Sequence, residues 1–425
     1  MAVDTPARIA VLGAGPIGLE TALYARYLGY DVDIYEQGQV AENVLRWGHV
    51  RLFTPWRDNV SPLGLAALSA QSESWRPPDG DALLTARQFA EEYLLPLARS
   101  DLLVDGLRTH TRVVAVGRPR QLKGDNVGRE AREEDDFRVL LRDQAGNESV
   151  ATADVVIDVC GTYGHHNWSG RGGIPAAGEM AASGQIEYGL PDILGRDREH
   201  YAGKNVLVVG AGYSAATSVL SLAELAAAIP GTHVVWITRP APTAGQAVPL
   251  AIIDNDRLVE RDRLARAANA LAGGTSSAVE YRPGAMIEAI DRSAAHGRLL
   301  VRLSRNHDEI VASRDETVEV DRIIANVGYR GDSQIYRELQ VHECYAGGGP
   351  MKLAAALAGS TSADCLDQSP HGAQSLLTTE PDFYILGSKS YGRNPRFLLS
   401  IGLAQIRDLF TIIGDRADLD LYRTV

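Results

Sequence analysis

The sequence predicts an α/β protein built around two parallel sheets, because one pattern occurs twice. Residues 8–36 and 204–239 each run from an apolar strand through a glycine-rich turn and a helix of small residues to a second strand. A single G-x-G-x-x-G string is weak evidence in a chain with 42 glycines. Two complete units, about 200 residues apart, predict two Rossmann-like dinucleotide-binding domains.

The glycines of the first turn have separate physical roles. Gly13 allows the tight turn after the strand, Gly15 lets the backbone approach a pyrophosphate, and Gly18 lets the helix pack closely on the sheet. Pro16 stands at the start of that helix, whose free N–H groups face the phosphates. We therefore expect these four residues to contact a dinucleotide.

Glu36 ends the second strand of this unit, about 20 residues after the turn. A carboxylate at that position accepts hydrogen bonds from both ribose hydroxyls of an adenosine and repels a 2′-phosphate. The first site is therefore expected to hold FAD or NAD, and not NADP.

The second turn has Gly210, Gly212 and Ala215 at the three glycine positions, and alanine at the last one is an accepted form of the pattern. Its second strand ends with Thr238 and Arg239 in place of an acid. An arginine pairs bidentately with a phosphate. The second site is therefore expected to hold NADPH.

Ser214 adds a hydroxyl near the same turn, so it is included with Thr238 and Arg239 among the expected coenzyme contacts. An alternative stays open for Arg239, which is also an ordinary residue for the solvated end of a strand.

Charge and hydropathy exclude several classes of protein. The chain has 42 Lys and Arg against 54 Asp and Glu, a formal charge of −12, and a pI near 5.4. This argues against nucleic-acid or acidic-membrane partners, which call for clustered basic residues. The N-terminus enters the first strand almost at once, and no apolar run reaches the roughly 18 residues of a membrane span. A cytoplasmic protein is expected.

The three cysteines, Cys160, Cys344 and Cys365, are widely spaced and form no Cys-x-x-Cys pair. Neither a disulfide framework nor a zinc site is expected. The adjacent histidines His165 and His166 have no acid at ligand spacing, so no metal site is predicted there either. A dithiol relay of the usual form is excluded.

The segments between the two units have clear patterns of their own. Residues 83–99 have helical spacing, residues 108–118 and 137–143 alternate like strands, and the charged residues 124–136 between those strands predict a loop at a hairpin tip. Two acid-led apolar strands, 153–166 and 320–332, each stop at a glycine.

Those two strands carry a resemblance. They contain VCGTY (Val159 to Tyr163) and NVGYR (Asn326 to Arg330). With the two glycine turns, they make the chain similar to the flavin-containing monooxygenase, Baeyer–Villiger monooxygenase and N-hydroxylase group within the two-dinucleotide-domain flavoprotein superfamily. The resemblance implies that FAD occupies the first site, and that an NADPH domain is nested within a discontinuous FAD domain.

The implied domain order has three parts. Residues 1–165 form the first FAD-binding segment, residues 166–320 the NADPH-binding domain with a helical insertion at about 241–283, and residues 321–425 the second FAD-binding segment. The insertion is expected to cap a substrate channel or to mediate contacts in a homodimer. Residues 347–372 are expected to be the most mobile, lid-like region.

The chain also departs from the group. Residues 194–204 only loosely match the signature that precedes the second turn in flavin-containing monooxygenases, and Gly387-Ser388 stands where the superfamily commonly has Gly-Asp. We therefore assign no subfamily.

At the C-terminus, Asn394 and Pro395 predict the cap and first residue of an amphipathic helix. In the resembling flavoproteins the N-terminus of such a helix points at the flavin, so Gly387, Asn394 and Phe397 are expected there. A capped surface helix is the alternative.

Residues 43–64 resemble the flavin-contacting loop of the superfamily. Trp47 and Trp56 are expected to supply flat apolar walls, and His49 and Arg51 to act in catalysis by orienting the substrate or the hydroperoxide. The alternative is that they only anchor the loop. Three further residues complete the expected FAD contacts: Arg46, Val113 and Gly161.

The resemblance implies an FAD-dependent, NADPH-consuming monooxygenase. It would use molecular oxygen to transfer one oxygen atom from a flavin C4a-hydroperoxide to a small-molecule nucleophile, such as an amine or a thioether. Three alternatives remain: an NADPH-dependent reductase or oxidase without oxygen insertion, a thiol-linked reductase using Cys365 with His371, and a non-enzymatic dinucleotide-binding protein.

Overall fold

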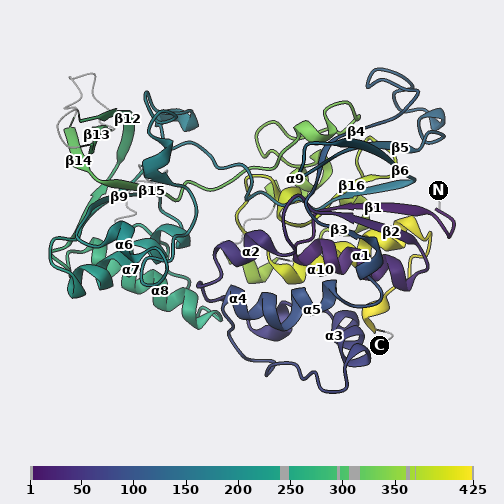
Figure 1. Cartoon of the computed structure of the whole chain (residues 1–425), viewed down its shortest axis with the longest axis horizontal. Coiled ribbons are helices and arrows are strands. Elements are labelled where there is room, and N and C mark those ends of the chain that lie inside the picture. Colours follow the sequence, from purple (N-terminus) through teal and green to yellow (C-terminus); the bar gives the residue numbers. More distant parts are fainter. Residues whose placement is uncertain are drawn as a thin grey trace. The chain divides into compact units, whose positions relative to one another are not determined.

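The computed structural model describes residues 3–239, 248–293, 297–305, 316–359, 364–368 and 370–423. The chain divides into two compact units (Figure 1). The first unit is Met1–His165 with Tyr329–Val425, and the second is His166–Gly328. The first unit is thus discontinuous in sequence, and the chain leaves it and returns to it once.

The first unit is built on a five-stranded parallel sheet in the order β16-β7-β1-β2-β3. A three-stranded antiparallel sheet, β4-β5-β6, lies in the same unit. The strands are β1 (Arg8–Leu12), β2 (Asp31–Tyr35), β3 (Leu107–Arg108), β4 (Thr111–Gly117), β5 (Phe137–Asp143), β6 (Glu148–Ala153), β7 (Val155–Asp158) and β16 (Phe383–Ile385).

Both faces of the parallel sheet are buried, and β1 shows how. Ile9 and Val11 belong to the core on the helix side, whereas Ala10 and Leu12 belong to the core shared with β4 and β5. This alternation is the two-residue period of a strand. A strand buried on both faces requires a continuous apolar run, which is what its sequence provides.

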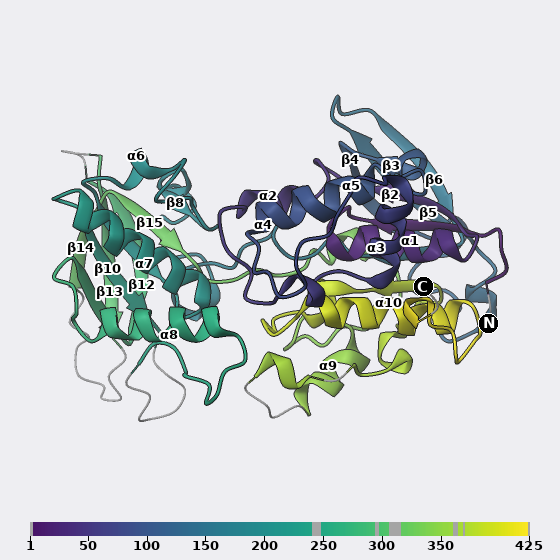
Figure 2. The same ribbon diagram turned by 90° about the horizontal axis from the view of Figure 1, so that it is seen from below.

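The helices of the first unit are α1 (Pro16–Tyr27), α2 (Glu42–Arg46), α3 (Pro62–Gln71), α4 (Ala86–Phe89), α5 (Leu95–Ala98), α9 (Met351–Ala358) and α10 (Leu399–Ile413). Figure 2 shows α1 and α10 side by side, and the rings of Tyr24 and Phe410 stack between them at 5.0 Å. The helix expected over 83–99 is present as α4, a π-helical turn and α5. It begins after Thr85, whose side chain forms a capping box with Gln88.

The second unit repeats the arrangement with a parallel sheet in the order β11-β10-β9-β15-β8 and a three-stranded antiparallel sheet, β12-β13-β14. Its strands are β8 (Ile186–Glu187), β9 (Asn205–Val209), β10 (His233–Thr238), β11 (Val279–Pro283), β12 (Ala285–Arg292), β13 (Leu299–Arg305), β14 (Glu316–Val320) and β15 (Arg322–Ala325). Its helices are α6 (Arg198–Tyr201), α7 (Tyr213–Ala228) and α8 (Val259–Ala272).

The α/β architecture with two Rossmann-like domains expected from the sequence is confirmed, with differences at the edges of the second unit. This unit ends at Gly328 and not at 320, because β15 pairs in parallel with β9 through Ile323 and Ile324. The expected insertion at 241–283 contains helix α8, but its last residues form β11, which pairs with β10 and extends the sheet. Residues 240–247 lie outside the described residues.

The expected start of the C-terminal helix was wrong. Helix α10 begins at Leu399, and Asn394 does not cap it. The side-chain oxygen of Asn394 instead accepts the N–H of Arg396 at 3.0 Å, which closes a local turn before the helix.

The region expected to be lid-like, 347–372, is held at its beginning. The N–H of Arg393 donates to the oxygen of Gly347 at 2.7 Å, and α9 buries Leu353 and Leu357. A side chain on Gly392 would lie only 2.2 Å from the oxygen of Gly347, so the two segments touch through their backbones. Residues 360–363 and 369 lie outside the described residues.

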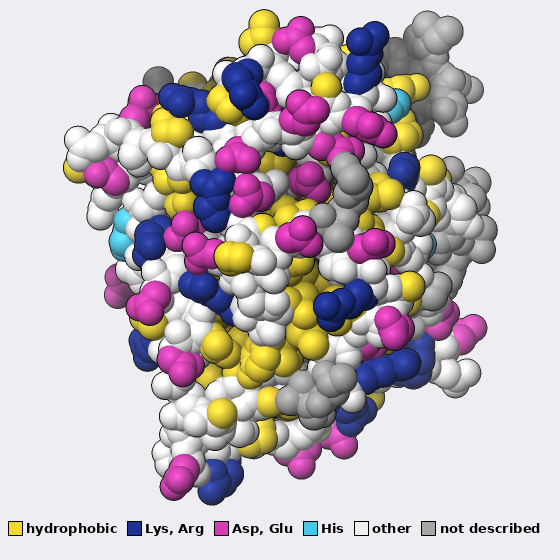
Figure 3. Space-filling view, turned by 90° about the vertical axis from the view of Figure 1, so that its right-hand side faces the viewer, with side chains coloured by type: hydrophobic (Ala, Val, Ile, Leu, Met, Phe, Trp, Pro, Cys, Tyr) yellow, Lys and Arg dark blue, Asp and Glu magenta, His cyan; other side chains and the backbone are white. Residues whose placement is uncertain are grey.

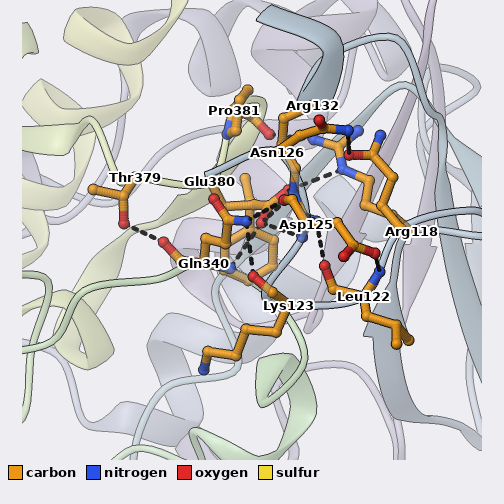
Figure 4. Close-up of polar contacts among 12 residues, drawn as sticks. Arg118, Leu122, Lys123, Asp125, Asn126, Arg132, Gln340, Thr379, Glu380 and Pro381 are labelled. Carbon is orange, nitrogen blue, oxygen red and sulfur yellow. Dashed lines mark hydrogen bonds and ion pairs between the residues drawn. The ribbon is translucent and has the colours of Figure 1, made fainter. Parts of the chain in front are cut away.

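The charged loop between β4 and β5 holds a buried ion network that the sequence did not predict (Figure 4). Arg118 and Arg132 donate to the carboxylate of Glu380 at 2.9 Å each, with side chains at most 1 % exposed. The N–H of Gln340 also donates to Glu380, at 2.7 Å. The network joins the hairpin loop to the C-terminal segment of the same unit.

A second buried acid lies in α1. Glu20 is 2 % exposed and accepts hydrogen bonds from the hydroxyls of Ser61, at 2.7 Å, and Tyr93. Burial raises the pKa of Glu20 to about 6, although these hydrogen bonds act in the opposite direction. The acid thus ties α1 to the start of α3 and to the π-helical turn.

On the face shown in Figure 3, basic and acidic side chains are interspersed, and apolar side chains gather near the centre. None of the helices in the described part of the chain is long and apolar enough to cross a membrane.

Glu20 predicts a specific pH dependence of stability. Because its folded pKa is raised from 4.5 to about 6, the folded state binds the proton more tightly than the unfolded state does. The stabilising contribution is complete below pH 4.5 and is lost as the pH rises through 6. We expect the free energy of unfolding of the wild type, relative to Glu20→Gln, to fall by about 2 kcal/mol over this range.

Urea unfolding followed from pH 4 to 7 measures this difference. Glu91→Gln, which changes an exposed glutamate (53 % exposed side chain), controls for the loss of a carboxylate in general. A wild type and Glu20→Gln variant that differ by the same amount at every pH would contradict the prediction.

Candidate functional site

The first glycine turn places the N-terminus of α1 at the carboxyl end of β1. Gly13 has φ +112°, and its N–H donates to the oxygen of Tyr35 at 2.8 Å. A Cβ on Gly18 would lie 1.9 Å from the oxygen of Gly13, so the helix approaches the turn more closely than any side chain permits.

Gly15 is different, because the protein itself does not require a glycine there. It precedes Pro16 as the N-cap of α1, with φ −82° and no side-chain cap. A Cβ on Gly15 would meet nothing within 4 Å. Free N–H groups that face open space suit an anion such as a pyrophosphate.

Glu36 lies beside this turn at the end of β2. Its two carboxylate oxygens accept the N–H groups of Ala14 at 2.9 Å and Gly38 at 2.8 Å. A carboxylate has about four acceptor positions, so about two remain for hydroxyl donors. The geometry therefore fits an adenosine ribose held next to the turn.

Loops that are far apart in the sequence meet at this edge. A Cβ on Gly13 would lie 3.0 Å from the oxygen of Val159, just after β7, and one on Gly161 would lie 3.6 Å from the hydroxyl of Ser388. Gly387 has φ +71° and lies against Ile17 of α1. Ligands of open parallel sheets bind at such carboxyl ends of strands.

The second glycine turn has the same construction in the second unit. Gly210 has φ +139°, and a Cβ there would lie 2.4 Å from the oxygen of Asn326. Ala215 is fully buried beneath the turn. Gly212 caps α7 without a side-chain bond, and a Cβ on it would meet nothing within 4 Å. This helix N-terminus is open in the same way as that of α1.

The three polar residues expected near this turn have different environments. Ser214, in the first turn of α7, and Arg239, directly after β10, are exposed. Thr238 is only 4 % exposed, and its hydroxyl is hydrogen-bonded to the hydroxyl of Tyr281 at 2.9 Å. Thr238 therefore supports the strand end, whereas Ser214 and Arg239 can reach a phosphate.

Trp47 belongs to the first-unit edge. Its ring stacks on that of Tyr163, two residues after Gly161, with centroids 6.3 Å apart, and Tyr163 contacts Tyr329 at 4.7 Å. The indole N–H of Trp47 is buried and has no hydrogen-bond partner within the described residues. Trp56, by contrast, is a core residue that packs on Phe89 and Tyr93.

For the other expected FAD contacts, Arg46, Val113 and Phe397, the structure gives no direct contact with the first glycine turn among the described residues. Arg46 is exposed and pairs with Glu42 at 2.6 Å. Val113 is buried in β4, two residues after Thr111, whose N–H donates to the oxygen of Glu36 at 2.8 Å. Phe397 makes an edge contact with Tyr391 at 5.4 Å.

His49 and Arg51, the expected catalytic residues, are both exposed. The guanidinium of Arg51 donates to the oxygen of Leu83 at 2.8 Å, which supports the pairing of their two loops. Their catalytic roles stay predictions.

The structure reveals a buried ion pair at the same edge. The ammonium of Lys389 lies 2.5 Å from the carboxylate of Asp158, with side chains 2 % and 0 % exposed. It also donates to the oxygen of Asp332 at 2.7 Å. Burial opposes the charge, but Asp158 holds the pKa of Lys389 above its ordinary value. A sequence signal existed, since Asp158 is a lone acid within an apolar strand.

Cys160 is next to this pair. Its thiol donates to the oxygen of Leu12 at 3.3 Å, and burial raises its pKa well above the ordinary value. A thiol in this state is a poor nucleophile. None of the three cysteines forms a disulfide bond within the described residues, and these residues contain no group of His, Cys, Asp and Glu that could hold a metal.

Comparison with known proteins adds the fold. Neither a protein-family model nor a curated protein matches the chain. Solved structures match almost all of it. The chain has the fold of the two-dinucleotide-domain flavoproteins. The fold that the resemblance implies is thereby confirmed.

Three of these structures illustrate the range. A bacillithiol disulfide reductase, Bdr (YpdA), from Bacillus cereus has a TM-score of 0.66 at 15% identity, over 96% of this chain and 99% of its own. The cadaverine monooxygenase DfoA of Erwinia amylovora has a TM-score of 0.62 at 15% identity, over 97% of this chain and 95% of its own. The ornithine N-hydroxylase KtzI of Kutzneria sp. 744 has a TM-score of 0.61 at 15% identity, over 97% of this chain and 100% of its own. The fold is thus shared by reductases and monooxygenases.

The Asp158–Lys389 pair predicts that removing one of the two charges destabilises the protein strongly, and that removing the other charge as well restores most of the stability. Lys389→Met leaves a buried carboxylate without its cation, which costs roughly 3–5 kcal/mol in the free energy of unfolding. Asp158→Asn combined with Lys389→Met removes both charges, and we expect most of that loss to be recovered. Urea unfolding of the two variants measures both effects.

Glu148→Gln is the matched control, because it breaks the Arg142–Glu148 pair, whose side chains are 46 % and 49 % exposed. Such a pair contributes at most about 1 kcal/mol. A Lys389→Met variant no less stable than this control would contradict the assignment.

Proposed function

We propose that the protein is an FAD-dependent oxidoreductase that takes its electrons from NADPH. The observation that carries the proposal is the pair of glycine turns, each with an open helix N-terminus. The first has the carboxylate of Glu36 beside it, and the second has exposed Ser214 and Arg239. An acid there favours FAD, and an arginine favours a coenzyme with a 2′-phosphate.

The chain's own residues have distinct tasks in this proposal. The N–H groups at the start of α1 bind the FAD pyrophosphate, and Glu36 binds the adenosine ribose. The loops that contain Gly161 and Ser388 approach the cofactor through their backbones, and Trp47 supplies an aromatic wall whose N–H needs an acceptor. When bound, FAD accepts hydride from NADPH and passes the electrons on.

We further propose that the electrons go to molecular oxygen, and that one oxygen atom is transferred to an amine or a thioether. The similarity to DfoA and KtzI, whose names describe a cadaverine monooxygenase and an ornithine N-hydroxylase, supports this reaction. The state of Cys160 also supports it, since a buried, protonated thiol is poorly suited to attack a disulfide.

The second candidate is an NADPH-dependent reductase or oxidase without oxygen insertion. The equally extensive similarity to the bacillithiol disulfide reductase favours it. It would use the same two dinucleotide sites, so it differs from the monooxygenase in its electron acceptor and in its products.

The cofactor assignment predicts the behaviour of Gly15→Val. The new side chain would fill the open space in front of α1 without touching the protein. We expect folded protein with its flavin absorbance near 450 nm reduced at least about tenfold, because the pyrophosphate can no longer approach the N–H groups. Gly124→Val is the matched control, since a Cβ there also meets nothing within 4 Å and the residue lies in the β4–β5 loop. Fully loaded Gly15→Val protein would overturn the FAD site.

The monooxygenase assignment predicts the fate of oxygen. With NADPH, ¹⁸O₂ and a panel of alkylamines and thioethers, we expect one ¹⁸O atom in a product for each NADPH consumed, measured by mass spectrometry. Recovery of all consumed oxygen as hydrogen peroxide with every compound would instead establish an oxidase. NADPH oxidation that requires a disulfide and no oxygen would establish a reductase.

A further inference from the structure

A small, mostly enclosed cavity lies in the first unit between α9, α10 and the loop that follows β16. It offers about 10 Å³ to the centre of a water-sized molecule. Its polar lining comes from His371, Ser375, Tyr391, Gln405 and Asp408. None of these residues has a task in the proposed reaction.

Two polar atoms of this lining have no partner within the described residues. The Tyr391 side chain is almost completely buried, at 3 % exposed, and its hydroxyl makes no hydrogen bond. The Nε2 atom of His371 is also buried and makes none. An unsatisfied buried polar group costs roughly 1–3 kcal/mol, so an occupant of the cavity that hydrogen-bonds to both residues would stabilise the fold.

The size and chemistry of the cavity select its occupant. A cavity holds a water molecule when it offers about 10–15 Å³ of this kind of space and two to four polar partners. This one meets both conditions and is too small for a larger ligand. We propose that one ordered water molecule occupies the cavity and bridges the Tyr391 hydroxyl to Nε2 of His371.

The protonation state of His371 is compatible with this bridge. Burial lowers the pKa of His371 below its ordinary value, so the imidazole is neutral at neutral pH and Nε2 is able to accept a hydrogen bond from the water. The water in turn accepts a hydrogen bond from the Tyr391 hydroxyl.

The water site lies behind the loop that follows β16. Gln405 lines the cavity, accepts the N–H of Gly387 at 2.9 Å and donates to the hydroxyl of Ser390 at 2.9 Å. Ser390 donates to the oxygen of Gly387 at 2.7 Å. The bridging water therefore joins His371 to Tyr391, which ends the turn that begins at Gly387. The site itself does not depend on the proposed function.

The direction of the stability change caused by one substitution, Tyr391→Phe, distinguishes a hydrated cavity from a dry one. If the water is present, Tyr391→Phe removes a satisfied hydroxyl and leaves the water short of a partner, so the unfolding equilibrium constant should rise roughly fivefold. If the cavity is dry, the same change removes an unsatisfied hydroxyl, and the protein should be equally or more stable. Urea unfolding of the FAD-saturated protein measures the change.

A double-mutant cycle tests the bridge. Tyr391→Phe and His371→Leu should be non-additive by roughly two- to tenfold in the unfolding equilibrium constant, because they share one water. Tyr422→Phe is the matched control: its hydroxyl is also buried without a partner among the described residues, but Tyr422 does not line this cavity. We expect no coupling between Tyr422→Phe and His371→Leu.

A high-resolution crystal structure gives the direct test. The proposal expects a density peak within about 3.2 Å of both the Tyr391 hydroxyl and Nε2 of His371. A dry cavity, or a Tyr391→Phe variant that is not destabilised and does not couple to His371→Leu, would overturn it. Neither result would bear on the assignment of FAD and NADPH, which is tested separately.

Discussion

The close approach of each glycine turn to neighbouring backbone is the constraint on which the rest of the structure depends. Gly18 lets α1 come within contact of the oxygen of Gly13, and Gly210 lets the second turn approach the oxygen of Asn326, just after β15. These contacts direct each helix N-terminus to the carboxyl end of a parallel sheet. The residue that caps each helix, Gly15 or Gly212, then faces open space. Each turn thus presents backbone N–H groups whose position suits an anion.

Buried charges hold the discontinuous first unit together. Lys389 and Asp158 are 231 positions apart in the sequence, and Arg132 and Glu380 are 248 apart. Both pairs join the C-terminal segment to the N-terminal one. Charges removed from water are expensive unless they are paired and hydrogen-bonded, and each of these has additional backbone partners. The cost of breaking them makes the return of the chain to the first unit specific, and it positions Gly387 against Ile17 and Ser388 against Gly161.

The chemistry at this edge follows from its surroundings more than from its catalytic side chains. Glu36 is already held by two N–H groups, so it needs little ordering to receive a ribose. The Trp47–Tyr163–Tyr329 contacts build an apolar wall beside the turn. Cys160, which lies close to the turn, is kept protonated by burial. The fold is shared by reductases and monooxygenases, so the fold alone does not separate oxygen insertion from reduction.

The sequence by itself determined the elements whose signals are local. The continuous apolar run of β1, the glycine spacings and the acid at Glu36 are enough to predict two parallel sheets and two dinucleotide turns, because each signal lies within about 30 residues. Tertiary structure decided what depends on distant partners. It showed that β15 completes the second unit, that Thr238 is engaged by Tyr281, and that Asn394 closes a turn in place of capping α10. It also brought Lys389 to Asp158 and Arg132 to Glu380. From the sequence, a charged residue in a polar loop is expected to be exposed to solvent. The carboxylate that compensates its burial lies hundreds of residues away in the chain, so no local pattern indicates it.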